Sequence, residues 1–379
     1  MNSVNFLEKL LDGAGVEWKA LRELISPQRG KRLVKSQLEE VGNYAVYQNS
    51  MTPLGYYHEC NAKAKTTFVI VAGAAGEIGY SDVDFWAADD VYFFPTAKAV
   101  NNKYLYHFLL TKQHEISSQV RRASVPRLSI TAVEKLKIPI PCPENPKKSL
   151  EIQAEIVRIL DNFTELTAEL TAELTAELTA RKTQYNYYRD KLLSFEEGEV
   201  EWRTLGEVAE FRRGTAITQK QTTVGNIPVV ANGPTPNYFH AESNRESETI
   251  VIARSGAYAG YISFWNQPIF LTDAFSVHPD SKILKTKFVY HLLQNKQEHI
   301  HSMKKGAGVP HVRVKEFESY NVPIPPLAEQ ARIVAILDKF DALTHSLTEG
   351  LPREIELRQK QYAYYRDLLL NFQGTSHAN

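Results

Sequence analysis

The sequence predicts an α+β protein in which two globular domains of mixed helix and sheet are joined by two long helices. Three observations support this prediction. Segments of the first half return in the second half, each half contains short apolar runs separated by Gly-rich turns, and each half ends in a long stretch with one apolar stripe. The tetrapeptide Thr-Ala-Glu-Leu also occurs three times in register over residues 167–178.

The two halves are related by an internal repeat. The run VEWKAL around Trp18 returns as VEWRTL around Trp202, which lies 184 positions later. Seven extra residues near Cys142 then reduce the offset to 177 for the helical part. Four more pairs of segments follow the same two offsets: residues 123–126 and 307–310, 138–141 and 322–325, 156–163 and 333–340, and 187–190 and 364–367.

The chain ends belong to the same repeat, because the run LEKLL at residues 7–11 resembles DKLL at residues 190–193. We therefore expect a circular, pseudo-two-fold organisation in which residues 1–15 pack near the C-terminal run at residues 368–372. Residues 374–379 are expected to form a flexible tail.

Composition is that of an ordinary soluble protein, with 43% hydrophobic and 23% charged residues. No apolar run approaches the ~20 residues of a membrane span, and the first residues do not have the order of a signal peptide, so we expect a cytoplasmic protein without a membrane partner. Cys60 and Cys142 form no CxxC pair, which argues against a structural zinc site. The formal net charge is zero, but the basic residues are clustered locally.

The globular domains are predicted at residues 16–148 and 197–322. Buried strands are expected at residues 66–71 and 249–253, since both are β-branched apolar runs followed by glycines. The middles of the two domains match poorly in sequence. We therefore expect the two domains to share a scaffold and to differ in their functional surface.

Long helices are expected after each domain, at residues 149–196 and 323–373. The prolines at residues 139–141 and 323–326 predict stiff extended entries into them. Each helix carries one apolar stripe, and pairing the two antiparallel as a coiled-coil-like spacer would bury both stripes; the alternative is that each helix packs only on its own domain. Pro352 should interrupt the second helix. The expected spacer residues are Leu166, Leu170, Leu174, Leu178, Leu347 and Leu351.

The tetrapeptide run has the geometry of a ruler. Each unit of four helical residues adds about 6 Å of rise and turns the helix about 40° beyond one full turn. A change in copy number would shift and rotate the two ends relative to each other without altering either end.

Catalytic motifs are missing from the sequence. The glycines at 73, 76 and 79 do not have G-x-G-x-x-G spacing, and neither a P-loop nor HExxH occurs. We therefore expect a scaffold that binds rather than an enzyme.

The whole combination resembles the DNA-specificity (S, or HsdS) subunits of Type I restriction-modification systems, in the branch with a central tetrapeptide repeat. It consists of two divergent domains, the repeated segments IVRILDNF/IVAILDKF and YNYYRDKLLSF/YAYYRDLLLNF, the PIP entries and the TAEL run. The resemblance implies a non-catalytic subunit with two target-recognition domains, each binding half of a split, asymmetric site in double-stranded DNA. It also implies two methyltransferase (modification) subunits that carry S-adenosylmethionine and dock on the helices, and restriction subunits that use ATP and Mg²⁺.

Basic loops are the expected DNA contacts, because phosphates attract cations and Arg or Lys side chains can read bases. Each cluster could equally be an ordinary solvated loop. The candidates are Arg29, Lys31, Arg32, Arg121, Arg122 and Arg127 in the first domain, and Arg212, Arg213, Arg254, Lys304, Lys305 and His311 in the second.

Two aromatic clusters near the helix ends are candidates for docking the methyltransferase subunits, with packing at the helix tip as the alternative. They are Tyr187, Tyr188 and Arg189, and Tyr364, Tyr365 and Arg366. An alternative interpretation of the whole chain is a tandem-domain adaptor that binds protein or sugar ligands across a coiled-coil spacer. A self-contained methyltransferase or nuclease is the third interpretation, since catalytic motifs are missing.

Overall fold

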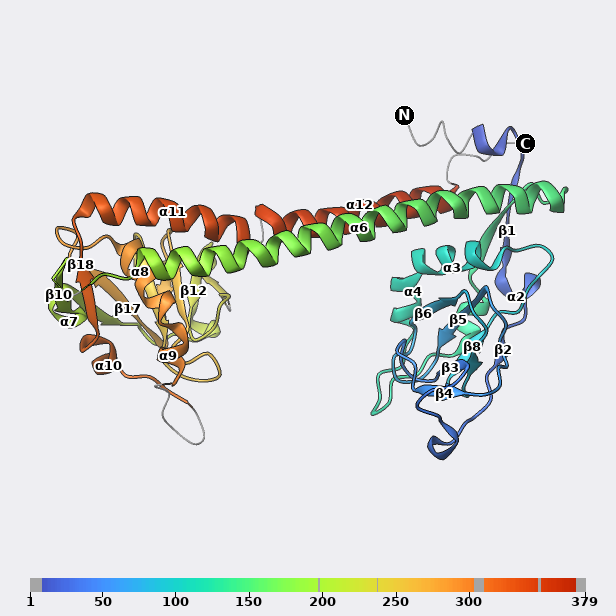
Figure 1. Cartoon of the computed structure of the whole chain (residues 1–379), viewed down its shortest axis with the longest axis horizontal. Helices are drawn as coiled ribbons and strands as arrows, with labels where there is room; N and C mark the ends of the chain where they lie inside the picture. The colour runs from blue at the N-terminus through green and yellow to red at the C-terminus, as the bar shows by residue number, and fades with distance from the viewer. Residues whose placement is uncertain (1–8, 197, 237, 303–309, 347–348, 373–379) are drawn as a thin grey trace. The chain divides into compact units, whose positions relative to one another are not determined.

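The computed structural model describes residues 9–196, 198–236, 238–302, 310–346 and 349–372 (Figure 1). The chain forms two compact units. Unit 1 comprises residues 1–173 and 355–379, and unit 2 comprises residues 174–354. Each unit contains one globular domain and parts of the long helices, which confirms the predicted fold class.

Unit 1 contains two small sheets and a two-stranded ribbon. The first sheet is antiparallel and its buried central strand is β5 (Thr66–Ile70), as its apolar sequence predicts. The order in this sheet is β2 (Gln28–Arg29), β8 (Val91–Phe93), β5 and β6 (Ile78–Ser81); the second sheet is β4 (Gly55–Tyr57), β3 (Tyr44–Tyr47) and β7 (Trp86–Ala87); and β1 (Val16–Ala20) pairs with β9 (Lys137–Pro141).

Short helices cover the sheets of unit 1. Asn101 caps the longest of them, because its side chain accepts hydrogen bonds from the backbone N–H groups of Lys103 and Tyr104. These helices are α2 (Leu21–Leu24), η1 (Lys35–Gln37), α3 (Asn102–Thr111), α4 (Gln113–Ser118) and α5 (Ile130–Glu134).

Unit 2 repeats this topology strand for strand, although the middles of the two domains differ in sequence. In both units the three-stranded sheet combines one antiparallel and one parallel pairing. Its sheets are β11 (Ala209–Arg213), β17 (Ala274–Pro279), β14 (Thr249–Ala253) and β15 (Ile262–Trp265), then β13 (Tyr238–His240), β12 (Ile227–Val230) and β16 (Phe270–Leu271), and the ribbon is β10 (Glu201–Thr204) with β18 (Asn321–Ile324). The helices are α7 (Leu205–Val208), η2 (Gln219–Gln221), α8 (Thr286–Asn295), α9 (Gln297–Ser302) and α10 (Val314–Glu318).

The ribbons show why two sequence repeats recur together. The VEWKAL and PIP segments are antiparallel strand partners, with Trp18 opposite Pro139 in unit 1 and Trp202 opposite Pro323 in unit 2. The prolines lie in extended backbone, as expected. Proline has no backbone N–H to donate, and this is tolerated in a ribbon of two strands because neither strand has a further neighbour on its outer side.

The TAEL repeats lie in one unbroken helix, α6 (Pro146–Leu192), of 47 residues. Asn145 begins it by accepting a hydrogen bond from the Lys148 backbone N–H at 3.1 Å, and Pro146 occupies the first turn, where it is tolerated. The second copy is divided into α11 (Leu327–His345) and α12 (Gly350–Asn371). Gly350 has a φ of +76° and Pro352 lies in the first turn of α12, which confirms the expected interruption.

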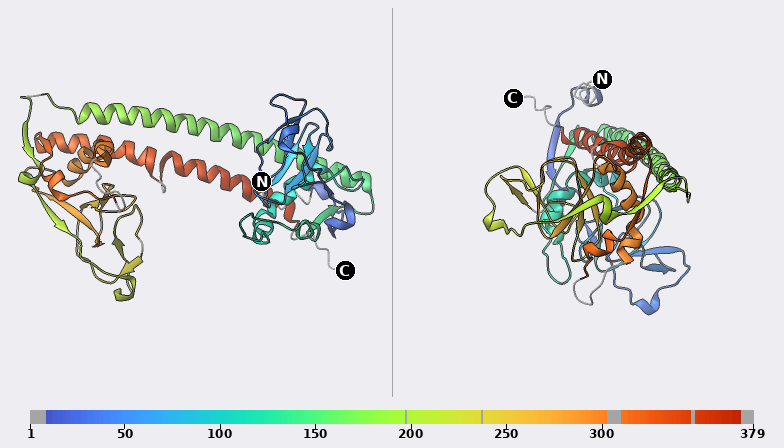
Figure 2. Two further views of the ribbon diagram at one scale, coloured as in Figure 1. Left: turned by 90° about the horizontal axis from the view of Figure 1, so that it is seen from below. Right: turned by 90° about the vertical axis from the view of Figure 1, so that its left-hand side faces the viewer.

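In unit 1, α6 and α12 run antiparallel and side by side (Figure 2). The Thr164 hydroxyl donates a hydrogen bond to the Tyr362 hydroxyl at 2.9 Å, and the rings of Phe163 and Tyr365 stack with centroids 5.7 Å apart. In unit 2 the ring of Tyr188 on α6 stacks in the same way on Phe340 of α11, with centroids 5.8 Å apart.

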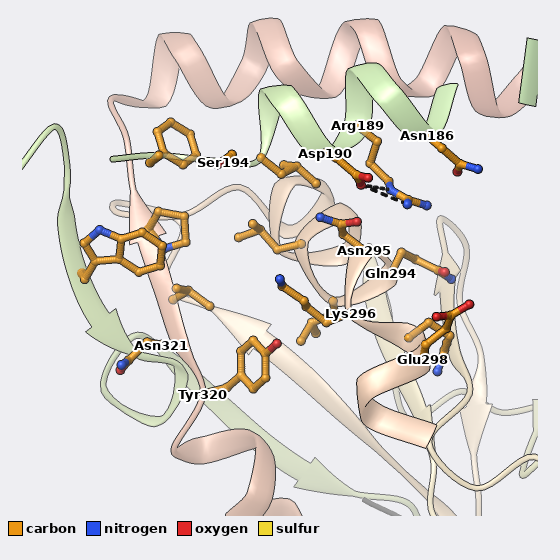
Figure 3. Close-up of a pocket in the computed structure, with 18 residues that line it drawn as sticks. Asn186, Arg189, Asp190, Ser194, Gln294, Asn295, Lys296, Glu298, Tyr320 and Asn321 are labelled. Atoms are coloured by element: carbon orange, nitrogen blue, oxygen red, sulfur yellow. Dashed lines mark hydrogen bonds and ion pairs between the residues drawn. The ribbon is translucent and has the colours of Figure 1, made fainter. Parts of the chain in front are cut away.

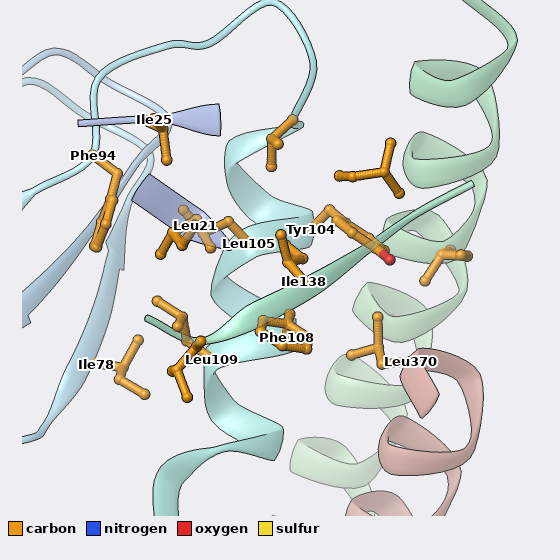
Figure 4. Close-up of a cluster of buried hydrophobic side chains, with 14 of the residues drawn as sticks. Leu21, Ile25, Ile78, Phe94, Tyr104, Leu105, Phe108, Leu109, Ile138 and Leu370 are labelled. Carbon is orange, nitrogen blue, oxygen red and sulfur yellow. The ribbon is translucent and has the colours of Figure 1, made fainter. Parts of the chain in front are cut away.

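One buried cluster in unit 1 joins the domain to both helices (Figure 4). Tyr104 is fully buried and its hydroxyl donates to the Pro139 carbonyl at 2.9 Å. Leu11, near the start of the described chain, belongs to the same cluster as Leu370 and Phe372 at its end. Unit 2 has an equivalent core around Phe288, Phe317 and Leu337, among others.

Candidate nucleic-acid interface

A cavity of about 730 Å³ in unit 2 collects several of the predicted DNA contacts. Arg213 is the last residue of β11, and Arg254 directly follows β14 in the same sheet, so both side chains leave one edge of it. His311 reaches the same place because its backbone forms a β-bridge with Ser255. The cavity is lined by Arg213, Arg254, Ser255, Phe275, His311, Val312, Arg313, Val314 and Lys315.

Arg254 is held in position by a polar cluster. Its Nη2 lies 2.8 Å from Oδ1 of Asp273, and Oδ2 of Asp273 accepts hydrogen bonds from the Ser255 hydroxyl at 3.1 Å and from the Asn232 amide. Asp273 has a φ of +34°, an uncommon backbone conformation for a residue other than glycine. The side chain of Arg254 is 51% exposed, so its guanidinium is both oriented and accessible.

Arg212 does not line this cavity, which separates it from the predicted contacts Arg213, Arg254 and His311. Successive strand residues point to opposite faces, and the Arg212 guanidinium pairs with Glu210 at 2.5 Å. Beneath it Arg245 is buried, and burial lowers the pKa of this guanidinium. Burial, aided by the charges of Arg212 and Arg245, lowers the pKa of His278 to about 4.

Unit 1 places its candidates on equivalent loops. Arg29 ends β2 as Arg213 ends β11, and its Nε donates to the Asp89 carbonyl at 2.9 Å. Arg121 and Arg127 exchange two backbone hydrogen bonds, of 2.8 and 3.1 Å. Arg127 occupies the position that His311 holds in unit 2. Lys31, Arg32 and Arg122 are exposed, whereas Lys304 and Lys305 lie outside the described residues.

The two units differ where Arg254 stands. The backbone N–H of Val312 donates to the Arg254 carbonyl, and in unit 1 the N–H of the matching Leu128 donates to the Val71 carbonyl. Val71 is buried and apolar. The same scaffold therefore presents a guanidinium in one unit and no charge in the other.

Sequence reasoning missed five residues of the unit 2 site: Asn232, Ser255, Asp273, Arg313 and Lys315. A signal was present for Arg313 and Lys315, since they follow the candidate His311 by two and four residues. No local pattern connects Asn232, Ser255 and Asp273, which meet only through the sheet.

The helix-end clusters divide into packed and exposed aromatics. Tyr188 and Tyr365 are 38% and 37% exposed and stack on Phe340 and Phe163, whereas Tyr187 and Tyr364 are 60% and 63% exposed. The guanidinium groups of Arg189 and Arg366 lie over the rings of Tyr185 and Tyr362 and pair with Asp190 and Asp367, both at 3.0 Å.

The predicted spacer leucines are unequal. Leu166 is 51% exposed, so it contributes less to the stripe than the sequence indicates. Leu170, Leu174 and Leu178 are partly buried, Leu351 is buried, and Leu347 lies outside the described residues.

A further repeated cluster anchors each domain on its helix. In unit 1 the buried His107 Nε2 lies 3.1 Å from Oδ1 of Asp161 on α6, and Lys103 Nζ lies 3.0 Å from Oδ2. In unit 2, His291 and Lys287 contact Asp338 of α11 at 2.9 and 2.7 Å. Burial lowers the pKa of both histidines, and their hydrogen bonds to the carboxylates oppose this shift.

In the part of the chain that the structure describes, no group of three or more His, Cys, Asp or Glu side chains is placed to hold a metal ion. No helix among these described residues has the length and hydropathy needed to cross a membrane.

The two domains share one topology but carry different basic loops at matching strand ends, and one long helix is common to both units. These features define a class of two-domain recognition proteins. Comparisons with known proteins specify the class further. Residues 14–180 and 197–357 match the family described as type I restriction modification DNA specificity domain, once in each half. The chain belongs to this family, and it is a Type I specificity subunit with two target-recognition domains.

The following two relatives span nearly the whole chain. It is 40% identical to the EcoR124I/EcoR124II specificity subunit of Escherichia coli over 405 aligned positions, covering 98% of both chains. It is 36% identical to a putative type I specificity subunit of Haemophilus influenzae, covering 98% of this chain and 99% of that protein.

Solved structures share the fold. The S subunit of a Type I system from M. genitalium has 21% identity and a TM-score of 0.57, covering 94% of this chain and 96% of that chain. A chain from a study of type I R-M complex assembly and conformational transition has 16% identity and a TM-score of 0.64, covering 96% of this chain and 98% of that chain.

Proposed function

We propose that this specificity subunit directs adenine methylation to a bipartite, asymmetric DNA site, each target-recognition domain binding one half-site. The observation that carries the proposal is the pair of matching loops with different chemistry. Arg254, aligned by Asp273, stands in unit 2 where unit 1 has Val71. Because base pairs are distinguished by the hydrogen-bonding groups presented to them, different side chains at one scaffold position favour different half-sites.

The basic residues around the cavity supply the second part of DNA binding. Phosphate contacts provide most of the affinity but carry no sequence information. Arg213, Arg313 and Lys315 surround Arg254 as cations that could bind phosphates. A neutral chain can therefore bind DNA through a local concentration of positive charge.

The partners of the complex follow from the same proposal. Two methyltransferase subunits dock on the repeated helix ends and bring S-adenosylmethionine, and restriction subunits that use ATP and Mg²⁺ join this core. The exposed Tyr187 and Tyr364 are the best docking candidates of the two aromatic clusters, since Tyr188 and Tyr365 are engaged in stacking within the chain.

Methylome sequencing of a host expressing the chain with its methyltransferase subunit tests the proposal. We expect one methylated motif with two different half-sites separated by a fixed number of unspecified base pairs. A continuous motif, two identical half-sites, or no methylation in the presence of a soluble complex would contradict it.

A further inference from the structure

Two exposed tryptophans occupy the same place in both units. Trp18 on β1 is 39% exposed and Trp202 on β10 is 43% exposed. Each stands opposite a proline of its ribbon, Pro139 or Pro323. Packing within the domain does not account for an indole with this much surface in water, and aromatic side chains are enriched at protein interfaces.

A groove lies beside each tryptophan. In unit 2 it has a volume of about 990 Å³ and its lining includes Trp202. Lys296, Tyr320, and Arg189 and Asp190 near the end of α6 also line it (Figure 3). In unit 1 a groove of about 780 Å³ is lined by Trp18, Lys112 and residues of α4 and α5, among others.

The two grooves coincide under the internal repeat. Four positions line both of them: Trp18 and Trp202, Lys112 and Lys296, Leu136 and Tyr320, and Lys137 and Asn321. The tryptophan and the first lysine are identical in the two units. An indole and an ammonium group thus line each groove, at matching places of the two units.

The tryptophan and the lysine are the same in both units, whereas the residues at the predicted DNA contacts differ between the units. Arg127 is replaced by His311, and Val71 by Arg254, at matching positions of the two units. Matching positions that carry different side chains fit ligands that differ, namely the two half-sites. Exposed residues that are the same in both fit a ligand that is the same in both.

We infer that the Trp18 and Trp202 grooves are twin docking sites for two copies of one protein subunit. Each groove takes a segment with an apolar side chain against the indole and an acidic side chain toward Lys112 or Lys296. The unit 2 groove reaches one of the helix-end candidates, because Arg189 lines it. This inference rests on the proposed function, in which the docking subunit is the methyltransferase.

The test measures how many methyltransferase subunits bind the full-length chain. The variants are Trp18→Ala, Trp202→Ala and the double variant, each mixed with the methyltransferase subunit and weighed by native mass spectrometry. We expect two bound copies for the unaltered chain, one for each single variant at concentrations near the dissociation constant, and none for the double variant. Each affected site should lose at least about tenfold in affinity, as for a buried aromatic hot spot.

Two further sets of variants separate docking from folding. Lys296→Glu reverses an exposed charge, and Lys112→Glu reverses a half-buried one that also lies 3.9 Å from Glu115. Each should also weaken the binding of one copy, because an acidic partner side chain would be repelled. Phe239→Ala removes another exposed aromatic of unit 2, 53% exposed and outside the groove, and should leave two copies bound.

Several outcomes would overturn the inference. If folded Trp202→Ala binds two copies with unchanged affinity, the groove is not a docking site. If the tryptophan variants keep both copies but lose DNA affinity in fluorescence anisotropy, the grooves bind DNA instead. If the unaltered chain binds no methyltransferase subunit, the proposed function fails, and this inference fails with it.

Discussion

The Arg254 guanidinium is held by Asp273, and Asp273 is in turn held by Ser255 and Asn232. Such an arrangement fixes one edge of the guanidinium and leaves other N–H groups to face a ligand. Arginine commonly contacts the O6 and N7 acceptors of guanine with two parallel hydrogen bonds. A pre-oriented arginine loses less conformational entropy on binding than a free one.

We predict that Arg254→Ala removes one guanine requirement from the half-site read by unit 2. Discrimination at that position should fall by about 1–3 kcal/mol, the usual contribution of an Arg–guanine pair. Methylome sequencing should show one relaxed position and an unchanged first half-site. The matched control is Arg212→Ala, which removes an arginine paired with Glu210 outside the cavity and should leave the motif unchanged. A change in the first half-site would contradict the assignment.

Buried histidines make stability depend on pH. Burial lowers the pKa of His107 and His291 below the ordinary value of about 6.5, so the native state binds fewer protons than the unfolded state when the pH falls below that value. Their contribution is present above pH of about 6.5 and is lost as the pH falls toward the native pKa. The same sign holds for His278, whose pKa lies at about 4.

We expect the double variant His107→Gln and His291→Gln to lose part of this dependence. Glutamine can still donate to Asp161 and Asp338 but does not titrate. Urea unfolding at pH 7.5 and pH 5.0 should show a smaller drop in the free energy of unfolding than the unaltered chain shows. An equal drop in both proteins would assign the pH dependence to other groups.

The TAEL segment of α6 is the element whose length has a direct consequence. The helix is continuous from Pro146 to Leu192, whereas the second copy is interrupted between α11 and α12. One tetrapeptide turns the helix about 40° beyond a full turn, close to the ~34–36° between neighbouring base pairs, and adds about 6 Å of length. The rotation therefore corresponds to about one base pair.

Deletion of residues 171–174 should shorten the unspecified spacer of the DNA site by about one base pair. Both half-sites should stay the same, because the deletion leaves the loops around Arg254 and Arg127 untouched. The methylated motif of the deletion variant, compared with that of the unaltered chain, gives both quantities at once. Altered half-site bases with an unchanged spacer would show that α6 does not act as a ruler.

Across the whole molecule, the two ends of the described chain contribute to one core. Leu11 lies in the same buried cluster as Leu369, Leu370 and Phe372. The segment between α6 and β10 is exposed at Glu196, and Gly198 there has a φ of +94°. By the internal repeat, this segment is the counterpart of the region where the two chain ends meet in unit 1.

A circular permutant should therefore fold. We predict that joining the termini through a short linker and opening the chain between residues 196 and 198 gives a soluble protein with cooperative thermal unfolding. Circular dichroism should show the helix content of the parent. A control permutant opened inside α6, between Thr171 and Ala172, should be strongly destabilised because it cuts the long helix. Failure of the first permutant to fold would contradict a circular organisation.

The sequence by itself determined the features that depend on local pattern. The internal repeat, the buried strands β5 and β14, the extended PIP segments, the long helix and its interruption near Pro352 all follow from periodicity, proline geometry and self-similarity. Those properties act over a few residues, or are visible when two segments are compared.

Only the tertiary structure decided which side chains meet. Sequence clustering placed Arg212 beside Arg213, but strand alternation sends one toward Glu210 and the other into the cavity. Asn232, Arg254 and Asp273 lie far apart in sequence, and the sheet that joins β14 to β17 brings the last two together. Likewise Trp18 and Lys112 form a groove only after folding, because contacts between distant residues depend on strand pairing and packing that no local pattern encodes.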